Sequence, residues 1–292
     1  MYSERYQQHI KTLVEKIEQA DAIVVGGASG MSAAGGYNWY EDNAAFREHF
    51  GDFAIKYGID SIFGGFYYRF QTLEERWAYL ARLVNFVSQA PMAKPYENLF
   101  ELIQNKDYYI LTTNQDRQFY HVFPETKVSA IQGDWTHIQC AQRCHDQVYD
   151  FSEEAHNLCT KIIDTQIPFD DIPICPSCGG NMELWVRSFV FLEGTKYKNE
   201  LEKLNEYLLM VKHKRVLFLE LGVGPMTPMF IKEPFWNLTY MWPNAYYITI
   251  NPKDAILPEK LENKGQAIHE DIQQVLGDSV KYRQTLENSV NL

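Results

Sequence analysis

The stretch AIVVGGASGMSAAGG, residues 22–36, decides how the rest of the sequence is interpreted. Its first six residues predict a short buried β-strand, and the glycines that follow predict a tight turn into a helix. Such a turn brings backbone N–H groups to a phosphate at a helix N-terminus, which is typical of a dinucleotide site. Any tight strand-to-helix turn also recruits glycine, so the stretch indicates a nucleotide site only together with other features.

Apolar strands and amphipathic helices alternate around this stretch. Helical spacing predicts helices over residues 4–19, near 73–87, near 99–103, near 201–211 and near 265–277. Short apolar runs predict strands over residues 108–113, 127–133, 184–191, 215–222 and 245–251. This alternation predicts an α/β fold with a doubly wound, parallel, Rossmann-like sheet.

Two segments interrupt the alternation. One is rich in aromatic residues, irregular at first and helical from Leu73, and the other is a loop-rich segment with cysteines and prolines. The predicted division has three parts: a Rossmann-like domain (1–36, 108–134 and 185–292), a helical insertion (37–107) and a zinc-binding module (135–184).

Charge and composition exclude several classes of protein. The 292 residues carry a net charge of −11, with 46% hydrophobic and 22% charged residues. An acidic chain is a poor binder of nucleic acid or of anionic membranes, which need concentrated Lys and Arg. The charged N-terminus does not resemble a secretory signal, and the apolar runs are too short to span a bilayer. We therefore predict a cytoplasmic protein that binds neither nucleic acid nor membrane.

Four of the five cysteines form two close pairs. Cys140 and Cys144 have C-x3-C spacing, and Cys175 and Cys178 lie in the C-x2-C segment CPSCGG. Four thiolates in two pairs predict a closed tetrahedral zinc site with a structural role. Because the first pair is loosely spaced, His145 or His137 stays open as a replacement for one sulfur. The fifth, Cys159, is interpreted as a small buried hydrophobe.

The glycine turn does not match the dehydrogenases that it first suggests. The spacing of Gly26, Gly27 and Gly30 does not give G-x-G-x-x-G. A short-chain dehydrogenase has glycine where this chain has Ser32, and it needs a Tyr followed four residues later by Lys. None of the 19 tyrosines has that partner, so the dehydrogenase interpretation is set aside.

The order of motifs resembles the sirtuins, which are NAD-consuming protein deacylases and ADP-ribosyltransferases. VVGGASGMS resembles their first strand and turn, TTNQD their Thr-Gln-Asn-Ile-Asp, QG (132–133) their His-Gly, ELGVG their Gly-Thr-Ser stretch and ITIN their last strand. The resemblance implies that NAD is the co-substrate and that Asn114 and Asp116 hold its nicotinamide and ribose. It also implies cofactor contacts from Ala28, Ser29, Gly30, Ser32, Thr113, Gly222, Gly224 and Asn251.

Departures from the sirtuin pattern resemble one branch, the class M sirtuins of microbial pathogens. This chain has YNWYEDN in place of the nicotinamide-closing loop, and LWVRSFVFLEG where the family has a Phe-Gly-Glu substrate strand. That branch has Gln in place of the His and modifies a lipoyl-carrying, glycine-cleavage H-like protein. The resemblance therefore implies such a carrier as acceptor, with a macrodomain protein and a lipoate ligase as further partners.

Gln132 separates the possible activities. In deacylation a His removes a proton from a ribose hydroxyl, and general-base catalysis of this kind contributes roughly 10² to 10⁴-fold. A Gln amide can orient groups by hydrogen bonds but cannot accept that proton at neutral pH. Cleavage at the ribose C1′ needs positioning more than a titrating base. The sequence thus favours a mono-ADP-ribosyltransferase with Asn114, Asp116 and Gln132 in the catalytic set.

Two alternatives stay open from the sequence. One is a specialised NAD-dependent deacylase, such as a delipoylase or deacetylase, and the other is a non-catalytic sensor of NAD or ADP-ribose. Arg187 is a further catalytic candidate, either orienting the acceptor or lying as a solvated arginine on a strand edge.

Overall fold

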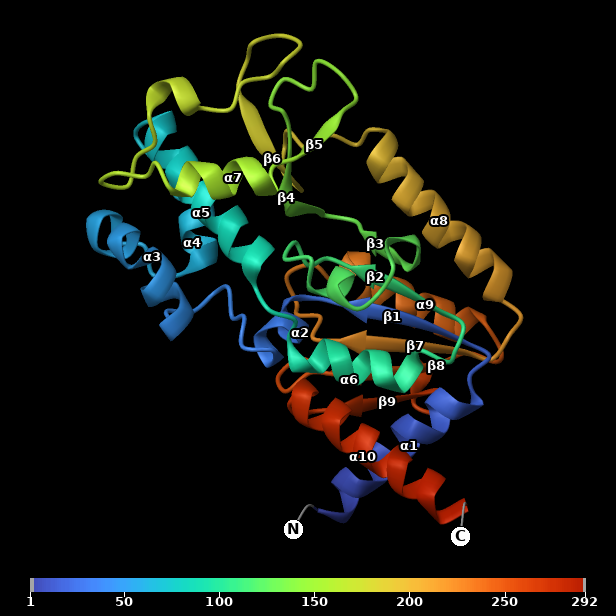
Figure 1. The fold of residues 1–292 in the computed structure, drawn as a ribbon. Coiled ribbons are helices and arrows are strands. Elements are labelled where there is room, and N and C mark those ends of the chain that lie inside the picture. Colours follow the sequence, from blue (N-terminus) through green and yellow to red (C-terminus); the bar gives the residue numbers. More distant parts are fainter. Residues whose placement is uncertain (1–2, 291–292) are drawn as a thin grey trace.

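A parallel six-stranded sheet forms the centre of the larger domain (Figure 1). The computed structural model describes residues 3–290, so the predicted domain limits at 1–2 and 291–292 lie outside the described residues. The strands follow the order β3-β2-β1-β7-β8-β9. They are β1 (Ala22–Gly27), β2 (Tyr108–Thr112), β3 (Val128–Ala130), β7 (Val216–Leu221), β8 (Tyr246–Ile250) and β9 (Gly265–Ile268). The predicted α/β fold with a parallel sheet is confirmed.

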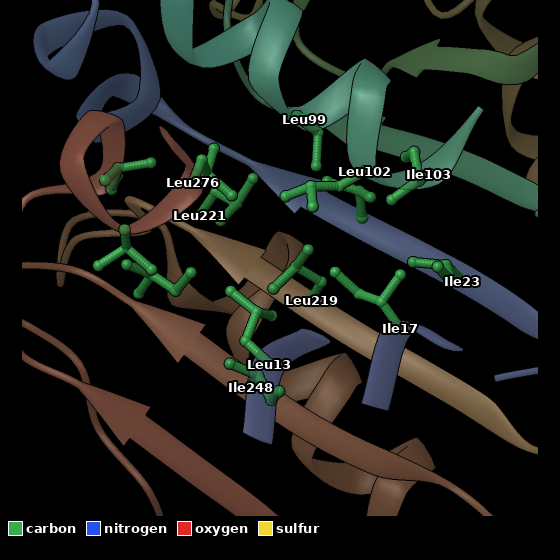
Figure 2. Packing of buried hydrophobic residues seen from close by; sticks show 14 of the residues in the cluster. Leu13, Ile17, Ile23, Leu99, Leu102, Ile103, Leu219, Leu221, Ile248 and Leu276 are labelled. Carbon is green, nitrogen blue, oxygen red and sulfur yellow. The ribbon is translucent and has the colours of Figure 1, made fainter. Parts of the chain in front are cut away.

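Helices cover both faces of this sheet. One layer contains α1 (Glu4–Gln19), α6 (Lys94–Ile103) and α10 (Ile272–Val290), and the other contains α8 (Thr195–Val211) and α9 (Lys232–Met241). Alternate residues of β1 serve the two layers, with Ile23 in the first core and Val24 in the second. Figure 2 shows the first core, where Leu13, Leu99 and Leu276 meet the sheet. Both faces of β1 are therefore buried, which explains its unbroken apolar run.

The second domain combines most of the helical insertion with the cysteine-rich segment. A three-stranded antiparallel sheet of order β5-β4-β6 lies beside helices, at the top of Figure 1. Its elements are α3 (Ala44–Tyr57), α4 (Ile62–Phe66), α5 (Leu73–Gln89), β4 (Gly133–Cys140), β5 (Val148–Asp150), α7 (Ser152–Cys159) and β6 (Met182–Val186). Phe50 and Trp77 from the helices share one core with Leu184 of β6 and Cys175 of the cysteine-rich segment. Helices and zinc module thus pack as one body.

Short elements complete the chain. They are α2 (Ser29–Ala34) and the 3₁₀ helices η1 (Gln118–His121), η2 (Glu125–Lys127), η3 (Phe169–Asp171), η4 (Pro228–Phe230) and η5 (Glu259–Leu261). Within residues 3–290, no helix has the length and apolar character needed to cross a bilayer.

Three local predictions from the sequence are wrong. Gly265–Ile268 form the edge strand β9 and not the start of a helix, because they pair with β8; the helix begins only at Ile272. The strand predicted over 184–191 ends at Val186, because the Gln139 side chain of β4 bonds to the backbone of Val190 and Leu192 in the loop that follows. The segment before Leu73 is not irregular, since α3 and α4 form there.

One helix of the predicted insertion belongs to the other core. Helix α6 lies within residues 37–107, yet its Leu99, Leu102 and Ile103 pack on the main sheet. The chain therefore returns to the larger domain before β2 begins.

A buried ion pair ties α9 to the sheet. Lys232 Nζ lies 2.7 Å from Glu220 Oε1 of β7, and both side chains are at most 2% exposed. Thr249 and Tyr247 of β8 also donate to this carboxylate, and Lys232 donates to the Asp254 carbonyl at 3.0 Å. Burial raises the pKa of Glu220, and Lys232 counteracts that rise. The pair joins β7, β8, α9 and the loop after β8.

We predict that Lys232→Met lowers the free energy of unfolding by roughly 3–5 kcal/mol, because it leaves a buried carboxylate without its cation. Chemical denaturation monitored by circular dichroism measures the change. Lys253→Met is the matched control, since Lys253 is exposed in the same region and should change stability little. Equal stability of the two variants would contradict the structural role of the pair.

Candidate active site and metal centre

The candidate residues come together because the strand ends are in register. Ala130, Thr112, Gly27, Leu221 and Ile250 form one row across the sheet. The segments that leave this row carry sequence-predicted residues from all five strands. Ligands of open α/β sheets bind outside the carboxyl ends of strands, where the direction of strand order reverses. Here that point lies between β1 and β7, directly at the glycine turn.

A buried polar cluster lies at the ends of β1 and β2. Asn114 Nδ2 donates to Ser32 Oγ at 3.0 Å and to the Ala28 carbonyl at 3.1 Å. Ser32 Oγ donates to Asp116 Oδ2 and lies 3.1 Å from the Tyr96 hydroxyl. Ser32, Asn114 and Asp116, which the sequence analysis singled out separately, therefore form a single network.

The Asp116 carboxylate is the electrostatic centre of this cluster. Trp39 Nε1 donates to Oδ2 at 3.1 Å, and the Gln118 N–H donates to Oδ1 at 3.1 Å. Burial raises the pKa of Asp116, and the hydrogen bonds from Ser32, Gln118 and Trp39 counteract that rise. A fixed, hydrogen-bonded carboxyl group in a dry site interacts strongly with positive charge that develops beside it.

The glycine turn touches the loop after β7 through backbone atoms alone. A Cβ on Gly30 would lie 2.6 Å from Gly222 Cα, and Gly222 has a left-handed φ of 69°. The Gly30 N–H donates to the Gly222 carbonyl at 3.1 Å. The N–H groups of Ala28 and Met31 also donate within the protein, to Leu221 and Ala28 carbonyls. Glycine is therefore required at both positions of this contact.

The remaining predicted cofactor residues line the same edge. Ser29 is half-buried at the start of α2, and Thr113 and Gly224 are half-buried on the loops after β2 and β7. Asn251 is buried after β8, and its Oδ1 accepts the N–H groups of Lys253 and Asp254, both at 3.0 Å. Its Nδ2 donates to the Val223 carbonyl at 3.3 Å. Asn251 thus shapes two loops of the predicted NAD site.

Gln132 lies between β3 and β4. The Ile131 N–H bonds to the Thr112 carbonyl, so Gln132 leaves the sheet beside the Asn114 loop. Its side chain is half-buried and makes no hydrogen bond to the described residues. The next residue, Gly133, has φ 73°, and a Cβ there would lie 1.8 Å from the Trp185 carbonyl oxygen. This contact fixes the backbone that carries Gln132, while the amide itself stays available to a ligand.

Arg187 is held next to Gln132. Its backbone N–H donates to the Gln132 carbonyl at 2.9 Å, and Nη2 donates to the Ile131 carbonyl at 3.4 Å. The guanidinium lies 4.4 Å from the Phe191 ring centroid and pairs with Glu193. It lies just beyond the strand, as a fixed cation close to the predicted reaction edge.

Charged groups gather on β4 and α8 near this point. Asp134 Oδ1 accepts from His137 Nδ1 at 2.7 Å, and Oδ2 lies 3.3 Å from Arg117. Burial opposes ionisation of Asp134, but the hydrogen bond from His137 and the charge of Arg117 lower its pKa to about 2. His137 is therefore engaged with Asp134 and lies outside the cysteine cluster. Burial raises the pKa of Glu200 to about 7, and this carboxyl accepts the Ala130 N–H at 2.8 Å.

Four thiols meet at the tip of the second domain. One ligand atom from each of Cys140, Cys144, Cys175 and Cys178 lies within 4.8 Å of the others. Burial opposes ionisation of the Cys140 thiol, but hydrogen bonds from Cys144 and Gln142 lower its pKa to about 6. Four thiolates are a typical zinc donor set, so the residues fit a structural zinc ion. His145 Nδ1 is 3.0 Å from Cys144 Sγ, within hydrogen-bond distance of that sulfur, and the four sulfurs form the ligand cluster.

The whole chain resembles solved sirtuin structures. A Sir2 homologue solved as an NAD complex has a TM-score of 0.58 at 15% identity, covering 94% of each chain, which establishes the shared fold. A protein ADP-ribosyltransferase of Staphylococcus aureus strain Mu50 is 32% identical over 278 residues, covering 94% of this chain and 87% of the relative. The chain belongs to the sirtuin-type protein ADP-ribosyltransferases.

A second relative carries an additional described activity. A probable bifunctional ADP-ribose hydrolase/ADP-ribosyltransferase of Fusarium oxysporum f. sp. cubense is 26% identical over 234 residues, covering 75% of this chain and 38% of the relative. No established protein-family model matches the chain. The predicted sirtuin-type enzyme is confirmed, and the four predicted cysteines form a cluster that fits a zinc ion. The contacts to NAD and the roles of single residues stay predictions.

Sequence reasoning missed two members of the buried cluster of this ADP-ribosyltransferase. Trp39 and Tyr96 bond to Asp116 and Ser32, although 77 and 64 residues separate the partners. Trp39 lies in YNWYEDN, which the sequence analysis noted only as a departure from the family pattern. No local pattern marks Tyr96, because it lies on the buried face of α6 with ordinary core residues.

For the metal centre, we predict about one zinc per chain in the parent protein, the stoichiometry of one four-ligand site. Cys178→Ser should lose zinc and lower the melting temperature by roughly 5–10 °C, because metal binding contributes to folding. Cys159→Ser is the control, since Cys159 lies outside the cluster. Atomic absorption and calorimetry measure both effects. Full zinc loss with an unchanged melting temperature would contradict a structural role.

For Glu200, we predict a pH-dependent stability. Its pKa is raised from 4.5 to about 7 in the folded protein, so folding binds a proton and stability falls as pH rises through this range. Glu200→Gln keeps an oxygen for the Ala130 N–H and should be more stable than the parent at pH 8 by roughly 1–3 kcal/mol. Urea titrations between pH 5 and 8 test this, with exposed Glu202→Gln as control. Parallel curves for all three proteins would refute it.

Proposed function

We propose that the protein transfers one ADP-ribosyl group from NAD to a lipoyl-carrying, glycine-cleavage H-like protein. The observation that carries the transfer chemistry is the unpaired, half-buried Gln132 amide at the end of β3, beside the Asn114 loop. When bound, NAD supplies the group: the bond from ribose C1′ to nicotinamide is exchanged for a bond to an acceptor nucleophile, whose proton leaves.

The chain's own residues provide positioning and electrostatics for this exchange. Asn114 and Asp116 are fixed by Ser32 and the Ala28 carbonyl, so they present a rigid polar surface. The Asp116 carboxylate stabilises positive charge that develops on the ribose side of the site. Gln132 orients a hydroxyl or amide by hydrogen bonding and exchanges no proton. Prepositioned groups of this kind lower a barrier without a titrating base.

The nearest histidine of β4 supports the same interpretation. His137 is five residues beyond Gln132, and its Nδ1 is bonded to Asp134. A ring held by a buried carboxylate on another part of the strand is not placed to replace a base at Gln132. This arrangement favours transfer over deacylation, which needs a proton acceptor at the ribose.

The proposed partners follow from the class M resemblance. A lipoate ligase would prepare the carrier, and a macrodomain protein would remove the modification. The Fusarium relative supports the second idea, because its description joins an ADP-ribose hydrolase and a transferase in one protein. This protein would then attach ADP-ribose to the carrier, and the macrodomain protein would remove it.

We predict that Gln132→Ala lowers transfer to the lipoylated carrier by roughly 10²-fold, because loss of the orienting amide misplaces the reacting groups. Gln132→His should not exceed the parent rate. Gln274→Ala, a half-buried glutamine on α10, is the matched control. Labelled NAD, the carrier and each variant are incubated, and label on the carrier is counted; melting temperature and zinc content confirm folding.

The same assay separates the alternatives. O-acyl-ADP-ribose with loss of the acyl group would indicate a deacylase. Saturable NAD binding with no nicotinamide release would indicate a sensor. Transfer by Gln132→Ala at the parent rate would show that Gln132 has no catalytic role.

A further inference from the structure

The loop between β6 and α8 carries an exposed aromatic side chain. Phe189 is 104% exposed, while its neighbour Phe191 is buried at 4% against Trp185. Single exposed hydrophobic residues are common on protein surfaces, so the exposure of Phe189 alone does not indicate a function. The residues around Phe189 do indicate one.

A cavity of about 460 Å³ joins this loop to the cysteine-rich loop. Phe189, Arg187 and Glu193 line it from one side, and Arg143 lines it from the other. Because Arg143 directly precedes Cys144, the zinc centre fixes the loop that carries it. Two elements of the second domain thus create one concave surface, here called the Arg–Phe surface and defined by Arg143, Arg187 and Phe189.

The charge of this surface contrasts with that of the chain. The protein has a net charge of −11, yet two arginines face this cavity against one carboxylate. Arg143 is exposed and forms no ion pair with any of residues 3–290. Glu193 pairs with Arg187 but is 56% exposed, and surface pairs of this kind contribute at most about 1 kcal/mol. An incoming carboxylate can therefore exchange with Glu193 at little cost.

Part of the loop backbone is already hydrogen-bonded within the protein. The buried Gln139 side chain donates to the Val190 carbonyl at 2.5 Å and accepts the Leu192 N–H at 2.7 Å. Trp185 Nε1 donates to the Leu192 carbonyl at 3.1 Å. A partner that adds a strand needs free N–H and C=O groups along an edge. At Val190 and Leu192 these groups are already occupied, so the loop offers no continuous free edge, which favours recognition by its side chains.

The surface also lies directly beside the predicted reaction edge. Arg187 belongs to it, and the Arg187 N–H donates to the Gln132 carbonyl at 2.9 Å. A protein that binds this surface would thus contact the side chain of a residue whose backbone is bonded to Gln132.

We propose that the Arg–Phe surface docks the protein acceptor of ADP-ribose through an acidic segment with an adjacent apolar side chain. Carboxylates of the segment pair with Arg143 and Arg187, and the apolar side chain packs on Phe189. Aromatic residues and arginines are the side chains on which protein interfaces depend most. This inference rests on the proposed function, because it assumes that the acceptor is a protein.

The test measures transfer kinetics with a lipoylated glycine-cleavage H-like carrier as acceptor. Phe189→Ser and Arg143→Glu should each raise KM for the carrier about tenfold and leave NAD affinity, measured by calorimetry, as in the parent. Phe169→Ser and Arg5→Glu are the matched controls, since Phe169 is 72% exposed on η3 and Arg5 is exposed on α1. Raising salt from 50 to 200 mM should raise KM of the parent more than KM of Arg143→Glu.

A charge swap gives a second readout. Acidic residues of the carrier are changed to Lys one at a time, and one change should improve transfer by Arg143→Glu while weakening transfer by the parent. An unchanged KM in both Phe189→Ser and Arg143→Glu, with active parent, overturns the docking surface and leaves the proposed function intact. Absence of transfer by the parent to any protein defeats the proposed function, and the docking surface with it.

Discussion

The contact between Gly30 and Gly222 is the constraint on which the rest of the site depends. Two backbone segments touch without side chains between them, and a Cβ on either glycine would lie within 2.6 Å of the other. This approach holds the start of α2 against the loop after β7. Helix α2 in turn carries Ser32, which bonds to both Asn114 and Asp116. A backbone contact at the reversal of strand order thereby sets the geometry of the polar cluster.

The second domain is coupled to the same edge through strand β4. Gln132 immediately precedes this strand, and Cys140 of the metal centre ends it. A second connection runs through Asp146, whose carboxylate accepts the Thr195 N–H at the start of α8. Helix α8 then carries Glu200 to the Ala130 N–H of β3. The zinc module thus supports the position of Gln132 by two routes, directly through β4 and indirectly through α8 and β3.

The sequence predicted the helices and strands whose formation depends on neighbouring residues, because these elements have local patterns of apolar residues. Helix α1 and strand β1 have the predicted bounds, because their apolar spacing is strong and uninterrupted. The edge strand β9 was missed, since half-buried residues such as Gln266 give no period, and only pairing with β8 makes it a strand. Contacts between distant segments were not predictable at all: Trp39 reaches Asp116 through tertiary packing. The order of motifs predicted Asn114, Asp116 and Gln132 as site residues, but it did not predict Trp39 and Tyr96, which complete the buried cluster.

The loop after β6 shows how one buried amide changes what a surface can recognise. The sequence LWVRSFVF has the β-branched and aromatic content of a strand, and an extended loop there would present a free edge. Gln139, fully buried in β4, instead bonds to Val190 and Leu192 and folds the segment onto itself. The turn that results buries Phe191 and exposes Phe189, while Arg187 at its start stays bonded to Gln132 beside the β4–β6 pairing. A single buried polar side chain therefore turns a strand-forming sequence away from a regular strand and leaves the Phe189 side chain exposed to a partner.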